Sequence, residues 1–129
     1  MTFLADSSTW VDALRNKASW LRSNLQAQAA IAYTEPVLME VLMGARTTEE
    51  GTRLRQFMTG AELLPCESIA DFEGAALINR HGRGRGISVG KFDCLILAVA
   101  YRSRATLVTA DLRQAELGRV IGLDVTMCR

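Results

Sequence analysis

Four carboxylates differ from the other acidic residues of this chain in the sequence that surrounds them. Most of the 14 acids lie in polar stretches such as 49–50 and 67–73, where carboxylates are usually solvated. Glu40 is instead the only polar residue in 37–43, a stretch apolar on every face of a helix, so we expect it to be buried nearly all round. Its own helix has no basic residue before Arg46. An ionised Glu40 therefore requires compensation from elsewhere.

Asp93, Asp6 and Asp111 complete the set. Asp93 directly precedes the apolar run 94–100, and we expect a buried helix over 92–101. Asp6 directly follows an apolar strand expected over 2–5, and Asp111 follows one expected over 106–109. Ligands of open parallel sheets bind outside the carboxyl ends of the strands. We therefore expect all four acids to meet at that edge.

Oxygen ligands of this kind suit Mg²⁺ or Mn²⁺. Hard divalent cations prefer carboxylates, and the chain has no cluster of cysteine and histidine that would indicate zinc. Such ions activate water and stabilise the leaving oxygen in phosphodiester hydrolysis. Ser8 and Thr109 lie two residues from Asp6 and Asp111, and their hydroxyls are candidates to orient these carboxylates.

Each acid taken alone also has a structural interpretation. Asp6 and Asp111 could be N-caps of the helices that follow them. Asp93 could form a buried ion pair with Lys91 or Arg102. The joint arrangement of four acids favours the metal site over four separate structural roles.

Alternating strands and helices indicate the architecture that would position these acids. Right-handed crossovers between such elements produce a parallel sheet covered on both faces, a three-layer α/β/α sandwich. With 129 residues, 49% of them hydrophobic, one domain over 1–129 is expected. The expected strands are 2–5, 31–33, 63–65, 106–109 and 123–127, and the later helices are 34–44, 49–58, 68–80, 92–101 and 112–117.

Bulk properties limit the location and the partners. Residues 1–6 carry no basic leader and no membrane helix, which favours the cytoplasm. The three cysteines never form C-x-x-C, which is typical of unpaired thiols in a reducing compartment. A net charge of +1 does not by itself indicate a nucleic-acid-binding protein, so any such contact needs a local basic cluster.

Four sequence blocks resemble those of PIN domains of the VapC toxin type. Residues 6–11 resemble the Asp-Thr-Ser-x-Trp-x opening of that family. Residues 35–45, 89–96 and 107–111 resemble its second, third and fourth blocks. The resemblance covers the whole chain in the family's order. No single block is specific, but four in order are.

The resemblance implies the fold, the activity and the partners. These are an α/β/α sandwich, a metal-dependent endoribonuclease that is the toxin of a type II toxin–antitoxin pair, an RNA substrate, a homodimer and an antitoxin that wraps the toxin. Asp6, Glu40, Asp93 and Asp111 carry over as the residues that hold Mg²⁺ or Mn²⁺. The chain departs from the family at 111–114, where Asp-Leu-Arg-Gln replaces the frequent Asp-x-Asp-Phe. This departure counts against a tightly held second metal and a fifth acid.

A glycine-rich segment before Asp93 carries candidate contacts to RNA. Residues 82–90 contain four glycines and two arginines and are expected to form a flexible loop. The basic residues around it could bind RNA phosphates beside the metal. Ordinary solvated arginines on a surface loop are the alternative. The candidates are Arg80, Arg83, Arg85 and Lys91.

Two other functions are compatible with an acid-bearing doubly wound fold. A catalytically inactive PIN fold could act only as a protein-binding module. A receiver-like signalling domain would need adjacent acids after the first strand and a phospho-accepting Asp after a central strand. Here Asp6 is followed by serines and Asp93 lies in a helical run, which disfavours that alternative. Nuclease activity with and without Mg²⁺ separates the enzyme from both.

Overall fold

The central sheet is fully parallel and has five short strands. The computed structural model describes residues 1–129. The strands stand in the order β3-β2-β1-β4-β5, so the chain moves outward from β1 in one direction and later returns to build the other side. Their bounds are β1 (Thr2–Ala5), β2 (Ala30–Tyr33), β3 (Glu62–Leu63), β4 (Thr106–Thr109) and β5 (Val125–Met127).

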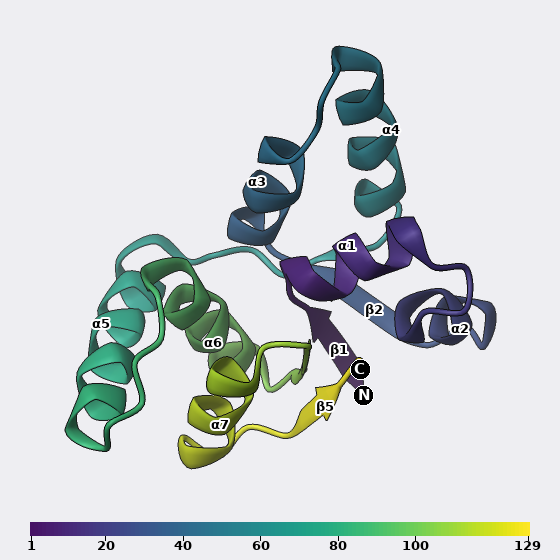
Figure 1. Ribbon diagram of the computed structural model, residues 1–129. Helices are drawn as coiled ribbons and strands as arrows, with labels where there is room; N and C mark the ends of the chain where they lie inside the picture. The colour runs from purple at the N-terminus through teal and green to yellow at the C-terminus, as the bar shows by residue number, and fades with distance from the viewer.

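Seven helices cover the sheet in two groups. Right-handed crossovers place the helices on opposite faces when the direction of strand addition reverses. Figure 1 accordingly shows α1 to α4 on one side of the molecule and α5 to α7 on the other. The expected three-layer sandwich is confirmed. The helices are α1 (Ser7–Arg15), α2 (Trp20–Gln26), α3 (Glu35–Met43), α4 (Thr48–Thr59), α5 (Ser68–Gly84), α6 (Lys91–Ser103) and α7 (Leu112–Val120).

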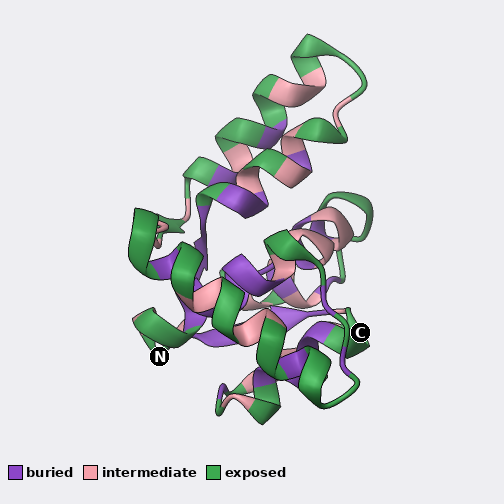
Figure 2. Cartoon of the chain, turned by 90° about the vertical axis from the view of Figure 1, so that its left-hand side faces the viewer, coloured by how far each residue is buried: buried purple, intermediate pink, exposed green.

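The core lies between the sheet and the helices nearest to it. A cluster of 23 buried hydrophobic residues joins the inner strands to α1, α6 and α7, and Leu4, Ile96 and Leu107 in it are fully buried. In Figure 2 the buried residues gather around the strands, while the α3–α4 hairpin projects from the body of the molecule. Burial of large apolar side chains is the main stabilising contribution to such a fold, about 1.5–3 kcal/mol for each.

Strand register places the carboxyl ends of β1 and β4 side by side. Ala5 pairs with Val108, and the amide of Asp6 donates to the carbonyl oxygen of Val108 over 3.0 Å. The residues that follow these two strands therefore lie at one edge of the sheet. This is the edge at which the sequence predicts the four acids to meet.

The expected burial of α3 on all faces is wrong. Met39 is 40% exposed and Met43 is 76% exposed, and Glu40 is only partly buried. The reason is the projection of the α3–α4 hairpin, which leaves much of the outer part of α3 without a covering element. The hydrophobic sequence of α3 therefore contributes to a surface as well as to the core.

The segment 82–90 is not entirely a loop, because α5 continues to Gly84. Gly82 is buried, and a Cβ atom there would lie 2.6 Å from the carbonyl oxygen of Ile87. The absence of a side chain lets the chain fold back so that the Ile87 amide donates to the Gly82 carbonyl over 2.8 Å. At least this glycine therefore serves close packing before Asp93 rather than flexibility.

The ends of α6 and the stretch 67–73 also differ from expectation. Phe92 and Tyr101 are 49% and 60% exposed, although residues 94–100 between them are buried as predicted. Asp71 was expected to be solvated with its neighbours but is 2% exposed. Arg102 compensates its charge, with Nε 3.0 Å from Oδ1 and a terminal nitrogen 2.9 Å from Oδ2.

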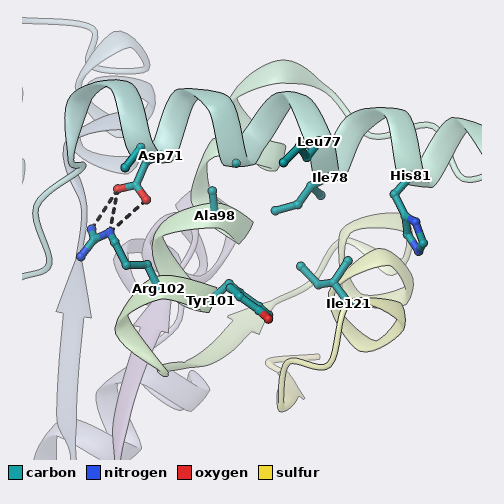
Figure 3. A pocket seen from close by; sticks show the side chains of 10 residues that line it. Asp71, Leu77, Ile78, His81, Ala98, Tyr101, Arg102 and Ile121 are labelled. Carbon is teal, nitrogen blue, oxygen red and sulfur yellow. Dashed lines mark hydrogen bonds and ion pairs between the residues drawn. The ribbon is translucent and has the colours of Figure 1, made fainter.

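The Asp71–Arg102 ion pair lies at one end of a cavity of about 680 Å³ between α5, α6 and α7. Figure 3 shows the pair at one end of this cavity and His81 at the other, with Leu77 and Ile121 among the apolar residues between them. None of the four candidate acids lines it. The cavity is therefore separate from the candidate metal centre.

Among the seven helices, none has the length and apolarity required to cross a bilayer.

Candidate metal centre

Asp6 is buried and held by hydrogen bonds at both oxygens. It is 3% exposed and caps α1, because Oδ1 accepts from the Thr9 amide over 3.1 Å. The hydroxyl of Ser8 donates to Oδ1 over 2.7 Å, and the hydroxyl of Thr109 donates to Oδ2 over 2.6 Å. The N-cap interpretation of Asp6 is therefore correct, but it does not account for the whole carboxylate. Capping uses only one of its oxygens.

Asp111 also caps a helix. Its Oδ1 accepts from the amides of Arg113 and Gln114 at the start of α7, over 2.9 and 3.1 Å. Its own amide donates to Oγ1 of Thr109 over 3.0 Å. Thr109, expected to orient the Asp111 carboxylate, therefore contacts the Asp111 main chain and the Asp6 carboxylate instead.

Glu40 carries the clearest sign of a missing partner. The hydroxyl of Ser7 donates to Oε2 over 3.2 Å, while Oε1 is buried and has no hydrogen-bond partner. Burial raises the pKa of Glu40, the Ser7 hydrogen bond opposes this, and the negative charge of Asp6 adds to the rise. A buried carboxylate oxygen without a donor is suited to accept a cation.

Asp93, in the first turn of α6, shares an electrostatic environment with the other three acids. Burial first, and then the charges of Glu40, Asp111 and Asp6, raise its pKa to about 6. Neither candidate pairs with it, because Arg102 is bound to Asp71 and Lys91 forms no ion pair. The ion-pair interpretation of Asp93 is therefore wrong. Four acids from distant parts of the sequence repel one another at this edge of the sheet.

The donor set fits a divalent cation. No three His, Cys, Asp or Glu side chains already stand in positions to hold one ion together. Mg²⁺ tolerates this, because it keeps several of its waters and is usually bound through only one or two carboxylates. The buried free oxygen of Glu40 and the raised pKa of Asp93 are the features that a cation would relieve.

Three of the four basic candidates gather in one cavity, which none of the four acids lines. Arg80 and Arg83 on α5 and Lys91 at the start of α6 line one cavity of about 900 Å³. Arg85, just beyond α5, is not among its lining residues, and its Nε donates to the imidazole of His81 over 3.1 Å. Lys91 and Asp93 both lie in the first turn of α6, but only Lys91 lines this cavity.

Sequence reasoning missed Ser7, Thr9 and Gln114. Ser7 contacts Glu40, and the Thr9 hydroxyl lies 3.0 Å from Oδ1 of Asp6. Gln114 is fully buried, with its side-chain amide between Thr109 and the main chain of Asp93. One signal was available for Gln114. It shares a helical face with the apolar residues Leu117 and Gly118, where an unpaired amide would be unfavourable.

A family model decides the relationship. The model of the PIN domain matches residues 3–120. This chain belongs to the PIN-domain family. The resemblance found in the four sequence blocks is therefore confirmed, and it extends over nearly the whole chain.

Curated relatives and solved structures agree with this assignment. The chain is 35% identical to VapC ribonuclease Mb1587 of Mycobacterium bovis and to Ribonuclease VapC11 of Mycobacterium tuberculosis, over 98% of this chain and of each relative. Its fold resembles that of VapBC2 from Rickettsia felis bound to a promoter DNA fragment, with a TM-score of 0.79, 21% identity and 98% of both chains covered. DNA-bound VapBC from Salmonella typhimurium has a TM-score of 0.79 and 23% identity, with 100% of this chain and 99% of that chain covered.

Proposed function

We propose that this PIN-domain protein is a metal-dependent endoribonuclease and the toxin of a toxin–antitoxin pair. The observation that carries the proposal is the convergence of Asp6, Glu40, Asp93 and Asp111 on one electrostatic environment, with one buried carboxylate oxygen left free. The 35% identity with proteins named VapC ribonucleases supports RNA as the substrate. The same four acids are our proposed ligands for Mg²⁺ or Mn²⁺.

The four acids would play unequal parts. When bound, the cation supplies an activated water and stabilises the leaving oxygen. Asp6 offers a carboxylate whose orientation is set in advance by Ser8 and Thr109. Glu40 and Asp93 have raised pKa values, and a bound cation would lower them by stabilising the ionised carboxylates. Preorganised and adaptable ligands are thus combined at one site.

The basic cavity is our proposed contact for the RNA backbone. Arg80, Arg83 and Lys91 line it together, and phosphate oxygens are natural acceptors for such side chains. Arg85 is the weakest of the four candidates because it lies outside this cavity. Each phosphate contact that is lost should weaken RNA binding and reduce its salt dependence.

The proposed antitoxin has a groove available beside the projecting α3–α4 hairpin. A cavity of about 580 Å³ there combines apolar residues, Val11, Leu14 and Phe57 among them, with four arginines. An amphipathic segment with acidic residues complements such a surface. A basic side chain from its tail could then reach the four acids in place of the metal. The arginines of this groove are Arg15, Arg22, Arg46 and Arg53.

A homodimer is our proposed assembly, formed through the outer face of α5 and α6. Phe72, Leu77 and Phe92 are large apolar residues that are 49–60% exposed on this face. These residues line the same cavity as Arg80, Arg83 and Lys91, so dimer formation through this face and RNA binding in this cavity would exclude each other. Phe72→Glu should convert the dimer to a monomer, as measured by light scattering.

We also propose the cytoplasm as the location.

Cleavage of a mixed RNA substrate by the purified protein tests the enzymatic function. We expect cleavage in Mg²⁺ or Mn²⁺ and none in EDTA. An inactive PIN module, or a receiver-like domain, would give no metal-stimulated cleavage under any condition. Co-expression with the neighbouring open reading frame tests the partner. If the protein does not co-purify with the product of that reading frame, the antitoxin proposal is contradicted, but the proposed nuclease activity is not.

A further inference from the structure

The buried residue Gln114 contacts two of the candidate acids, Asp93 and Asp111, and also Thr109, which donates to Asp6. It lies in the first turn of α7 and is fully buried. Its main-chain amide donates to Oδ1 of Asp111 over 3.1 Å. In its side chain, Oε1 lies 2.9 Å from Oγ1 of Thr109 and Nε2 lies 3.4 Å from the carbonyl oxygen of Asp93. One side chain thus joins β4 to α6 beside the acids.

The hydroxyl of Thr109 has one proton and two acceptors within reach. These are Oδ2 of Asp6 at 2.6 Å and Oε1 of Gln114 at 2.9 Å. A charged acceptor at the shorter distance takes the proton. The amide of Asp111 already donates to Oγ1 over 3.0 Å, which leaves one lone pair of this oxygen. That lone pair can accept a hydrogen bond from the Gln114 side chain.

A half-turn of the Gln114 amide plane supplies this donor. Oxygen and nitrogen of the amide exchange places, which leaves Nε2 2.9 Å from Oγ1 of Thr109 and Oε1 3.4 Å from the carbonyl oxygen of Asp93, a contact between two acceptors. Nε2 then donates to Oγ1 of Thr109, and Oγ1 donates to Oδ2 of Asp6, so the hydroxyl is fully satisfied. The bond given up is the longer one, to the carbonyl oxygen of Asp93 at 3.4 Å. A glutamate at this position could not complete the chain, because an ionised carboxylate has no donor.

We propose that Gln114 is a positioning residue for the metal centre, because its amide directs the Thr109 proton to Asp6 and fixes the Asp6 carboxylate before a cation binds. This inference rests on the proposed function, since it assumes that Asp6 is a metal ligand. It also accounts for the neutral side chain at position 114, because an acid there would add to the mutual repulsion of the four carboxylates.

Mn²⁺ binding to the purified protein, measured by calorimetry without RNA, tests the role. Gln114→Met keeps the approximate volume and removes the donor. It should weaken Mn²⁺ binding by about 10–100-fold, the usual effect of losing a group that orients a ligand. Thr109→Val should weaken binding similarly. The double variant should bind no more weakly than Thr109→Val, because both changes break the same chain. Leu117→Met, also fully buried on α7, is the matched control and should keep wild-type affinity.

Three outcomes would overturn the proposal. These are wild-type Mn²⁺ affinity in Gln114→Met, a loss in Leu117→Met as large as in Gln114→Met, or additive losses in the double variant. If wild type itself does not bind Mn²⁺, the proposed metal site fails and this inference fails with it. Wild-type binding with an unaffected Gln114→Met refutes the role of Gln114 alone.

A measurement on the wild-type protein covers the case in which Gln114→Met does not fold. The side-chain amide protons of Gln114 can be followed by NMR. We expect slow exchange with solvent and a shift of these resonances on addition of Mg²⁺. Rapid exchange, or resonances unaffected by saturating Mg²⁺, would also overturn the proposal.

Discussion

The hydroxyl of Thr109 donates to Oδ2 of Asp6 over 2.6 Å and so ties the carboxyl end of β4 to that of β1. Both residues are buried, and 103 positions separate them in the sequence. The bond stabilises a charge that has no basic partner. It therefore contributes to the fold as well as to the geometry of the candidate site.

Removing this hydroxyl should destabilise the protein. Thr109→Val keeps the side-chain shape but leaves an oxygen of Asp6 without its donor, which should lower the free energy of unfolding by about 1–3 kcal/mol. Thr109→Ser retains the hydroxyl and serves as the control. Urea denaturation in EDTA measures both. Wild-type stability of Thr109→Val would show that the bond makes no net contribution, and Thr109→Ser measures the separate cost of losing the buried methyl group.

Asp93→Asn should abolish cleavage without loss of the fold. The amide has the same shape but lacks the metal-binding charge, so we expect a rate at least about 100-fold lower in Mg²⁺. Growth inhibition on expression should disappear with it. Circular dichroism checks the fold. A purified variant that cleaves at the wild-type rate, free of contaminating nuclease, would remove Asp93 from the site.

Glu40→Gln should stabilise the metal-free protein. Two unit charges ~4 Å apart repel by about 4 kcal/mol at an effective dielectric of ~20, so neutralising one acid relieves strain. Ser7 can still donate to the new amide oxygen. We expect a melting temperature in EDTA equal to or above that of wild type, and a smaller increase on addition of Mn²⁺.

The wild-type response to metal is the control for this comparison. Mn²⁺ binds the folded state and should stabilise it by ~2.7 kcal/mol when free metal is ~100 times the dissociation constant. Equal melting temperatures for wild type in EDTA and in Mn²⁺, at metal levels that support cleavage, would refute a shared site.

Stability without metal should fall as pH rises from about 4 to about 6. The pKa of Asp93 is raised to about 6 in the folded protein, above its ordinary value of 3.8. The folded state therefore binds more protons than the unfolded state in this window, and each added pH unit lowers the free energy of unfolding by up to about 1.4 kcal/mol. Above about pH 6 this contribution is constant. Urea denaturation in EDTA at several pH values measures it.

Mn²⁺ affinity should change in the opposite direction. Protons compete with the cation for Asp93, so affinity should rise with pH up to about 6 and then level off. Asp93→Asn lacks this titrating group, so most of the pH dependence of both stability and Mn²⁺ affinity should disappear in this variant. A wild-type stability that rises between pH 4 and 6 in EDTA would contradict the assignment.

The ion pair of Asp71 and Arg102 should matter for stability alone. Arg102→Met leaves Asp71 buried with an uncompensated charge, and we expect a loss of about 3 kcal/mol. Asp71→Asn in the same chain should restore part of this loss. Arg119→Met, an exposed arginine outside the ion pairs, is the control. The rate per folded molecule should be unchanged, and a specific loss of cleavage would connect this pair to the site.

The sequence by itself determined the order of the elements and the type of sheet. Apolar runs and helix caps act over a few residues, so β1, β4 and the buried part of α6 were predicted closely. The same local patterns singled out Glu40 and Asp93, because a carboxylate inside an apolar run is visible without a structure. Asp6 and Asp111 were singled out because each directly follows an apolar strand, and the family-like blocks then included all four acids.

Only the tertiary structure decided which groups pair with the buried polar side chains, in the candidate site and outside it. The donor to Oδ2 of Asp6 lies 103 positions away at Thr109, the cation of Asp71 lies 31 positions away at Arg102, and Gln114 of α7 contacts Thr109 of β4. Hydrogen bonds require partners placed to within a few tenths of an ångström. Such placement follows from packing across layers of the fold, which sequence spacing along a single element does not encode.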